Sequence, residues 1–253
     1  LGLALCVAPL LALLVANVFF FRGKYYAYRP IYSKIRLKYA KSLFNLGVIF
    51  FIIQIAQIIQ FQSANIIISR SFGPSEVTSY NIAYKYFGIL NIVFVIFLTP
   101  FWSAATEAYM KKDMAWIKGS VKKYNYLVVA FVAAGILMLL FADIFYDLWL
   151  GKDTVLIEFS LSLWCFIYFA CSMFAGIYVS FLNGISALRL QFWASIVSPL
   201  VYIAIALFFI KYYKMGVYAL FVASVIANFN GIILAPLQYY MIVVKNKKGI
   251  WIK

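Results

Sequence analysis

The sequence predicts an all-α fold, a polytopic transmembrane helix bundle with about seven spans. Hydrophobic residues make up 66% of the 253 residues and charged residues only 11%. A soluble domain is usually about half apolar and about a quarter charged. The apolar residues fall into runs of about the twenty residues that a helix needs to cross a bilayer. Most of the charge lies between these runs, so lipid is the main solvent of the chain.

The apolar runs define seven predicted spans: residues 1–21, 43–69, 80–104, 124–148, 155–182, 191–210 and 217–244. At a rise of about 1.5 Å per residue, each is long enough to cross the hydrocarbon core, the longer ones with tilt. The chain begins inside an apolar run, with no Met and no basic segment before it. We therefore expect part of a longer protein rather than a signal peptide at its start.

Basic residues are distributed unevenly between the two sides of the predicted bundle. Of the 22 Lys and Arg residues, 17 lie in the tail and in the segments that follow the first, third and fifth spans. The positive-inside rule places these segments and the C-terminus in the cytoplasm. The same distribution accounts for the formal net charge of +15 without a nucleic-acid partner.

The basic segment after the first span has the pattern of a short interfacial helix. Ile31, Ile35 and Tyr39 recur at helical spacing, and Pro30 suits a first helical position. We expect this helix to lie in the cytoplasmic interface with its basic side chains on anionic headgroups. The alternative is a solvated connector. The predicted membrane-interface residues are Arg29, Lys34, Arg36 and Lys38.

The chain lacks histidine, which excludes His-based nucleophile activation, His general bases and His metal sites. Cys6, Cys165 and Cys171 fall in apolar runs without metal-type spacing, and we interpret them as small buried hydrophobic residues. We therefore predict no catalytic residue, no metal site and no cofactor.

Amide side chains are concentrated in the second predicted span, which carries Gln54, Gln57, Gln60, Gln62 and Asn65. At about 100° per residue, most of these positions drift slowly around one side of a helix. Amides in lipid need hydrogen-bonding partners. The pattern predicts the wall of a hydrated cavity that binds sugar hydroxyls. The alternative is hydrogen bonding between packed helices.

The third predicted span opens with polar residues on one face. Asn81 and Lys85 are four residues apart, and Tyr84 and Asn91 lie close to the same face. A lysine inside the membrane is costly and marks a candidate functional site. Lys85 is therefore predicted to hold a phosphate or an acidic sugar as a point charge. The alternatives are that it snorkels to the outer interface or pairs with Glu76.

Other polar or helix-breaking residues are interpreted structurally. Pro100 is expected to kink or end its helix near the cytoplasm. Glu107 is expected to pair with Lys111 at i+4. Asn228 and Asn230, in the last predicted span, are interpreted as helix-packing contacts.

Three stretches of the chain resemble the second half of a Wzx-type O-antigen flippase. These proteins belong to the multidrug/oligosaccharidyl-lipid/polysaccharide exporter superfamily. The first stretch is the amide-rich second span with the basic segment before it. The second and most specific is residues 72–85 (FGPSEVTSYNIAYK), followed by residues 99–104 (TPFWSA). The third is residues 181–185 (FLNGI) with residues 190–191 (LQ).

The resemblance implies a protein of about twelve helices, in two six-helix lobes around a central cavity. Residues 1–21 would be the last helix of the first lobe, and residues 22–42 a basic cytoplasmic and interfacial connector. Residues 43–244 would be the whole six-helix second lobe, and residues 245–253 a basic cytoplasmic tail. The first two helices of the second lobe would face the cavity.

The implied function is transport without covalent chemistry. Such proteins move an undecaprenyl-diphosphate-linked oligosaccharide from the cytoplasmic to the outer leaflet of the bacterial inner membrane. By this resemblance Lys85 would meet the diphosphate or an acidic sugar. Membrane lipids and other polysaccharide-assembly proteins are further candidate partners. The residues expected to meet water and hydroxyls are Gln54, Gln57, Asn81 and Asn91, with Gln60 and Tyr84 as further cavity candidates.

Three alternatives are kept. A cation-coupled multidrug exporter of the same superfamily would want carboxylates within the bundle. A membrane glycosyl polymerase or ligase would be expected to have a long outer loop with Arg or carboxylate groups. The third alternative is a structural subunit, in which Lys85 and the glutamines of the second span would only make contacts between helices.

Overall fold

The computed structural model describes residues 2–31, 36–152 and 154–252, and within these ranges its regular elements are all helical. The predicted all-α fold is confirmed. The chain divides into two compact units, Leu1–Leu46 and Gly47–Lys253. The first unit holds α1 (Gly2–Arg22), a 3₁₀ turn at Tyr26–Tyr28 and the start of α2 (Leu37–Ser71).

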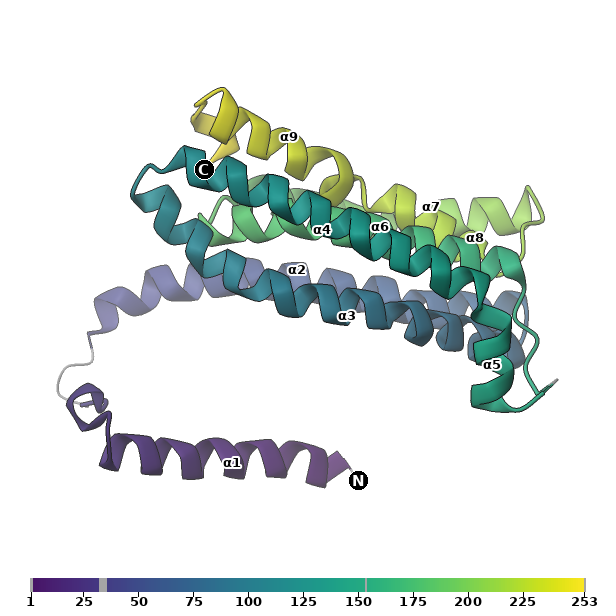
Figure 1. The fold of residues 1–253 in the computed structure, drawn as a ribbon, viewed down its shortest axis with the longest axis horizontal. Helices are drawn as coiled ribbons and strands as arrows, with labels where there is room; N and C mark the ends of the chain where they lie inside the picture. The colour runs from purple at the N-terminus through teal and green to yellow at the C-terminus, as the bar shows by residue number, and fades with distance from the viewer. Residues whose placement is uncertain (1, 32–35, 153, 253) are drawn as a thin grey trace. The chain divides into compact units, whose positions relative to one another are not determined.

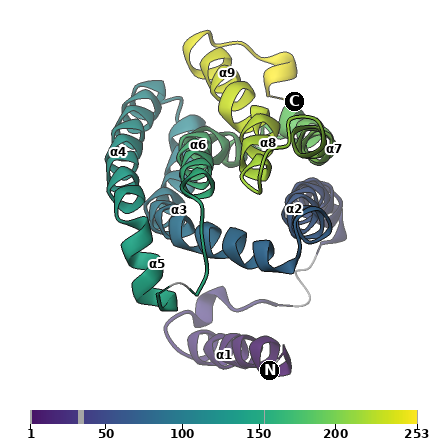
Figure 2. The same ribbon diagram turned by 90° about the vertical axis from the view of Figure 1, so that its right-hand side faces the viewer.

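The second unit contains the rest of α2 and a series of further helices, of which the long ones lie side by side (Figures 1 and 2). These are α3 (Pro74–Met110), α4 (Met114–Leu140), α5 (Ala142–Leu150), α6 (Phe159–Gly184), α7 (Arg189–Lys211) and α8 (Ala219–Ala227). After α8 the chain continues through a π-helical segment (Asn230–Leu234), α9 (Ala235–Tyr239) and a second π-helical segment (Tyr240–Val244). A 3₁₀ turn at Gly249–Trp251 follows.

This chain is a multi-pass membrane protein. Within the described residues, five helices are long and apolar enough to cross a bilayer, in α2, α3, α4, α6 and α7. A sixth span results if α8 and the segment Asn230–Val244, which meet at a bend of 41°, are counted as one. The first predicted span is helical as well, but its apolar helix Val7–Arg22 is shorter than the other spans.

Helix α6 forms the centre of the second unit. It packs against α3 and α4 on one side and against α8 on the other (Figure 2). Phe87 and Phe94 of α3 are fully buried, as are Met173, Ile177 and Phe181 of α6. Large apolar side chains also cover the outer faces of these helices, as expected of a bundle surrounded by lipid. The bundle is thus apolar both in its core and on its outer surface, so polar side chains within it mark candidate functional positions.

Local sequence explains where the long helices begin. Gly73 has a φ of 103°, a conformation that glycine adopts readily, and Pro74 then occupies the first turn of α3. Asp113 caps α4, because its carboxylate accepts a hydrogen bond from the backbone N–H of Trp116 at 2.9 Å. These two turns reverse the chain between α2, α3 and α4.

Several predicted boundaries are corrected by the structure. Helix α3 does not end at Pro100 but runs on to Met110, where the predicted ion pair between Glu107 and Lys111 is confirmed at 2.5 Å. Helix α4 ends at Leu140, eight residues before the predicted end, and α5 is a separate helix. The Tyr86 hydroxyl donates to the Met138 carbonyl at 2.9 Å, which satisfies a backbone acceptor near the end of α4.

The predicted interfacial helix falls partly outside the described residues, and the described residues at its start, 29–31, are not helical. Arg29 follows the 3₁₀ turn in an extended conformation (φ −58°, ψ 130°), as expected for a residue before proline. Arg36 is exposed and precedes α2, while Lys38 lies in the first turn of α2. Lys34 falls outside the described residues. Among the described residues after the 3₁₀ turn, helix begins at Leu37 and continues into the membrane span.

Candidate functional site

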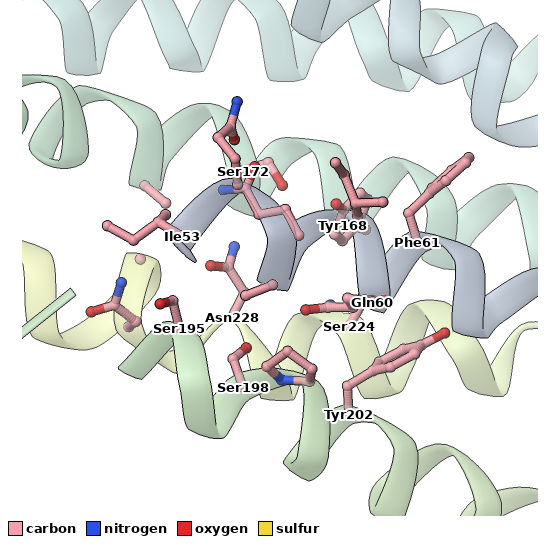
Figure 3. A pocket seen from close by; sticks show the side chains of 18 of the residues that line it. Ile53, Gln60, Phe61, Tyr168, Ser172, Ser195, Ser198, Tyr202, Ser224 and Asn228 are labelled. Atoms are coloured by element: carbon pink, nitrogen blue, oxygen red, sulfur yellow. The ribbon is translucent and has the colours of Figure 1, made fainter. Parts of the chain in front are cut away.

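A cavity of about 680 Å³ lies within the second unit. Its walls come from α2, α3, α6, α7 and the broken last span, so five parts of the bundle contribute (Figure 3). The resemblance had implied that the first two helices of this lobe face a cavity. Here they form only part of the lining.

Helix α2 supplies an amide wall. Gln54, Gln57, Gln60 and Gln62 all line the cavity, together with the apolar side chains of Ile53 and Phe61. Gln54 and Gln57 are exposed rather than packed against neighbouring helices. The alternative that these amides serve only to hold helices together is therefore not supported for these two residues.

Of the candidates predicted on α3, Tyr84 and Asn91 line the cavity, whereas Asn81 and Lys85 do not. The Asn81 side chain is half-buried and donates a hydrogen bond to Oδ1 of Asn65 on α2 at 3.0 Å. Lys85 is exposed. The face shared by Asn81 and Lys85 is thus separate from the cavity wall.

Helix α7 forms a second polar wall that sequence reasoning missed. Its lining residues include Gln191, Ser195, Ser198 and Tyr202. These positions are spaced by four, three and four residues, which places them on one face of a helix. The spacing was visible in the sequence, but serine and tyrosine are common in apolar helices and gave a weaker signal than the glutamines.

The break in the last span reaches the same cavity. Asn228 and Asn230, interpreted above as packing contacts, both line it, as does Ser224 of α8. Asn228 caps the end of α8, and the π-helical segment starts two residues later. The Ser198 hydroxyl donates to the carbonyl of Ala227 at 2.7 Å, so one acceptor freed by the break is satisfied from α7.

The last span packs closely against α6 next to the break. A Cβ atom at Gly231 would lie 2.8 Å from the Cβ of Ala175 on α6. The two backbones therefore approach more closely than a larger residue would allow, as small residues permit between membrane helices. π-Helical turns inside α-helices occur often at functional sites.

Aromatic rings form part of the cavity wall and pack against one another. Tyr84 packs against Phe61 of α2 with ring centroids 5.2 Å apart and against Phe169 of α6 at 5.0 Å. Tyr80 stacks on Phe221 of α8 at 4.5 Å with an interplanar angle of 14°. This packing fixes the position of Tyr84 at the cavity wall.

Two buried oxygens in the α7 wall lack partners. Gln191 is 8% exposed and Tyr202 is fully buried. The Tyr202 hydroxyl lies close to Ser224, but neither it nor Oε1 of Gln191 has a hydrogen bond of acceptable geometry in the described part of the chain. Buried polar atoms are almost always hydrogen-bonded. Because both atoms are themselves buried, they lie behind the cavity surface rather than on it.

The lining contains no Asp, Glu, Lys or Arg among the described residues. Nor do those residues include a group of three or more Cys, Asp or Glu side chains able to hold a metal ion. The cavity is suited to binding through neutral hydrogen bonds and ring contacts.

No protein-family model, curated protein or solved structure matches this chain. The resemblance noted above therefore remains an expectation from the sequence. The function that follows is a proposal built on the geometry of the cavity.

Proposed function

We propose that this chain is the C-terminal part of a flippase for undecaprenyl-diphosphate-linked oligosaccharide in the bacterial inner membrane, serving O-antigen or related polysaccharide biosynthesis. One observation carries the proposal. A cavity lined by neutral amides, hydroxyls and aromatic rings lies inside a bundle whose helices are otherwise apolar.

The physical problem of such transport is the passage of a sugar headgroup through hydrocarbon. Each hydroxyl that loses its water without a new partner costs free energy, and an oligosaccharide carries many hydroxyls. Amides can both donate and accept hydrogen bonds, so the α2 glutamines can replace part of that hydration. A cavity of about 680 Å³ is in the roughly 300–1,000 Å³ range of small-molecule sites.

The broken last span supports a transport role. Transporter binding sites are typically formed where discontinuous helices meet near the middle of the bilayer, and lobes rocking about the site give alternating access. In this chain the break at Asn228 opens onto the cavity. The prenyl tail would stay in lipid while the sugars cross.

The remaining parts of the proposal come from the sequence. The excess of basic residues in alternate segments supports a cytoplasmic C-terminus. Lys85, which is exposed and adjacent to Tyr84 of the cavity wall, is proposed to meet the diphosphate beside the sugar cavity. Other polysaccharide-assembly proteins are proposed partners in the same membrane.

The alternative functions receive less support from this lining. A cation-coupled drug exporter would be expected to hold carboxylates in the bundle, and the described lining residues include none. A glycosyl polymerase or ligase would need acid, base or anion-binding groups at its site. Among the described lining residues there is no Asp, Glu, Lys or Arg to serve in such a site.

The test uses the complete natural protein in cells that lack their own O-antigen flippase but make its lipid-linked substrate. The measurement is the fraction of labelled lipid-linked oligosaccharide that reaches the outer leaflet. Wild-type protein should restore translocation, and a Gln54→Leu/Gln57→Leu variant should reduce it because the amide wall is lost. The matched control is Ser103→Leu, an exposed polar residue outside the cavity. Failure of wild-type protein across several oligosaccharide backgrounds would refute the proposal.

A further inference from the structure

Helix α5 (Ala142–Leu150) follows directly after the membrane span α4. It has nine residues and is too short to cross a bilayer, which takes about twenty. We infer that α5 is an interfacial helix, which lies along the membrane surface with one apolar face in the lipid of the outer leaflet. The partner of this surface is the bilayer itself. The inference does not depend on the proposed transport function.

The side chains of α5 divide into three sectors around the helix axis. Ala142 and Tyr146 are buried, and Asp143 and Asp147 are exposed. At about 100° per residue, the sector opposite the two carboxylates holds only apolar side chains. Its members are large and exposed: Phe141 at the start of the helix, Ile144, Phe145, Leu148 and Trp149. An apolar sector opposite a charged one is the pattern of a helix that lies in a membrane interface.

Contacts with α3 and α6 fix the orientation of α5. The Tyr146 hydroxyl lies 3.1 Å from Oγ of Ser162 on α6. The ring of Tyr86 on α3 packs against Phe145 with centroids 4.6 Å apart and against Tyr146 at 5.2 Å. Figures 1 and 2 show α5 at the end of the bundle, running across the direction of the long helices. Because those helices cross the bilayer, α5 lies along its surface.

The length of α4 places α5 at the edge of the hydrocarbon. Lys123 is the last charged residue of α4, and residues 124–140 after it are uncharged. At a rise of about 1.5 Å per residue this stretch is about 25 Å long, close to the ~30 Å of the hydrocarbon core. Helix α4 therefore ends near the far boundary, and α5 follows at the level of the headgroups. Lysines at the other end of α4 identify this boundary as the outer one by the positive-inside rule.

The exposed apolar surface of α5 continues the lipid-facing surface of α4. Its residues are 58% to 84% exposed and follow one another at spacings of three or four: Leu137 and Leu140 of α4, then Ile144 and Leu148 of α5. Trp149, beside this surface, belongs to a residue type that is enriched at the level of the headgroups. Lipid covers the surface of α4, so the same solvent accounts for the apolar surface that extends from it onto α5.

The test measures the lipid exposure of α5 with nitroxide spin labels. The complete natural protein, with its native cysteines replaced by alanine, is reconstituted into vesicles of phosphatidylethanolamine and phosphatidylglycerol. Leu148→Cys and Asp147→Cys attach the label at neighbouring positions on different faces of α5. Collision rates of each label are measured with O₂, which concentrates in lipid, and with a water-soluble nickel chelate. We expect the ratio of O₂ to nickel collisions to be at least about threefold higher at position 148 than at position 147.

Two reference positions calibrate these ratios. Leu137→Cys, on the exposed face of the span α4, gives the value for lipid, and Lys152→Cys, exposed after the end of α5, gives the value for water. Equal ratios at positions 147 and 148 would overturn the inference. A label at position 148 that neither reagent reaches would overturn it as well, because a protein partner would then cover this face in place of lipid.

A further label tests the in-plane orientation. Ile144→Cys and Leu148→Cys are four residues apart, or about 6 Å along a helix axis. Both labels should lie at the same depth in a helix along the membrane surface. A depth difference of the full helical distance would show that α5 continues the direction of the span, which would contradict the inference. None of these results depends on whether the protein moves a lipid-linked oligosaccharide, so the proposed function is tested separately.

Discussion

Asn81 on α3 and Asn65 on α2 are joined by a hydrogen bond, in which Nδ2 of Asn81 donates to Oδ1 of Asn65 at 3.0 Å. The same amide also donates to the carbonyl of Val77 at 2.8 Å. The pair lies two turns from the reversal at Gly73 and ties the amide-bearing helix α2 to the core helix α3. Asn81, predicted from the sequence to face the substrate, instead positions the wall that lines the cavity.

Replacing Asn81 by Leu should weaken the attachment of α2. We expect a loss of roughly 0.5–1 kcal/mol in the free energy of unfolding, because hydrogen bonds between membrane helices are worth about this much. Unfolding by SDS in mixed micelles, followed by circular dichroism, measures the change. Asn65→Leu and the double variant complete a mutant cycle, and a coupling energy near zero would show that the bond contributes nothing.

Two glycines of α4 should respond in opposite ways to alanine. At Gly135 a Cβ atom would lie 2.3 Å from the ring of Phe166 and 3.0 Å from Leu90, so Gly135→Ala should cost about 1–3 kcal/mol of stability through overpacking. At Gly119 no heavy atom lies within 4 Å. Gly119→Ala should therefore stabilise the helix, by up to about 1 kcal/mol. Thermal unfolding in detergent compares the pair, and a stabilising Gly135→Ala would contradict this account of the α4–α6 contact.

The sequence predicted the parts of the fold that depend on composition and local chemistry. Long apolar runs identified the helices, although the third span was predicted to begin at residue 80 and α3 begins at Pro74. The high density of amides predicted a cavity wall on α2, and its glutamines do line the cavity. Each of these signals is contained within one helix, so no knowledge of packing was needed.

The sequence did not predict features that arise between helices. Helical periodicity grouped Asn81 with Lys85 on one face but could not say which way that face points, and the structure places both outside the cavity lining. Gly231, next to the break in the last span, lies close to Ala175, which is more than fifty residues earlier in the chain. Such contacts are set by tertiary packing and leave no periodic pattern.

Tyr146 provides a test of packing by pH. Its hydroxyl lies 3.1 Å from Oγ of Ser162, which joins α5 to α6, and α5 is not among the candidate spans. Burial raises the pKa of Tyr146 above its ordinary value of 10.0. Because the folded state favours the protonated phenol, this stabilisation is fully present below pH 10 and is lost as the pH rises toward the raised pKa.

Tyr146→Phe should therefore be less stable than wild type at neutral pH, by about 1 kcal/mol. The difference should stay constant below about pH 10 and change as the pH rises above it, since only the wild type carries a phenol that ionises more readily unfolded than folded. Denaturation curves measured across this range give the two free energies of unfolding. Curves that stay parallel at all pH values would show that Tyr146 titrates as freely when folded as when unfolded.

The position of Lys85 outside the cavity lining suggests separate sites for the sugars and for the diphosphate. If the uncharged cavity holds sugars, the diphosphate must be met elsewhere, and Lys85 is exposed next to Tyr84 of the cavity wall. Lys85→Ala should then lower translocation by about tenfold, the value of one charge-assisted hydrogen bond. The loss should be equal for neutral and acidic oligosaccharides, because the diphosphate is common to both.

Lys85→Arg should retain activity. The control is Lys211→Ala, which removes an exposed lysine outside the cavity. Wild-type translocation by Lys85→Ala would instead make this lysine an anchor at the membrane interface.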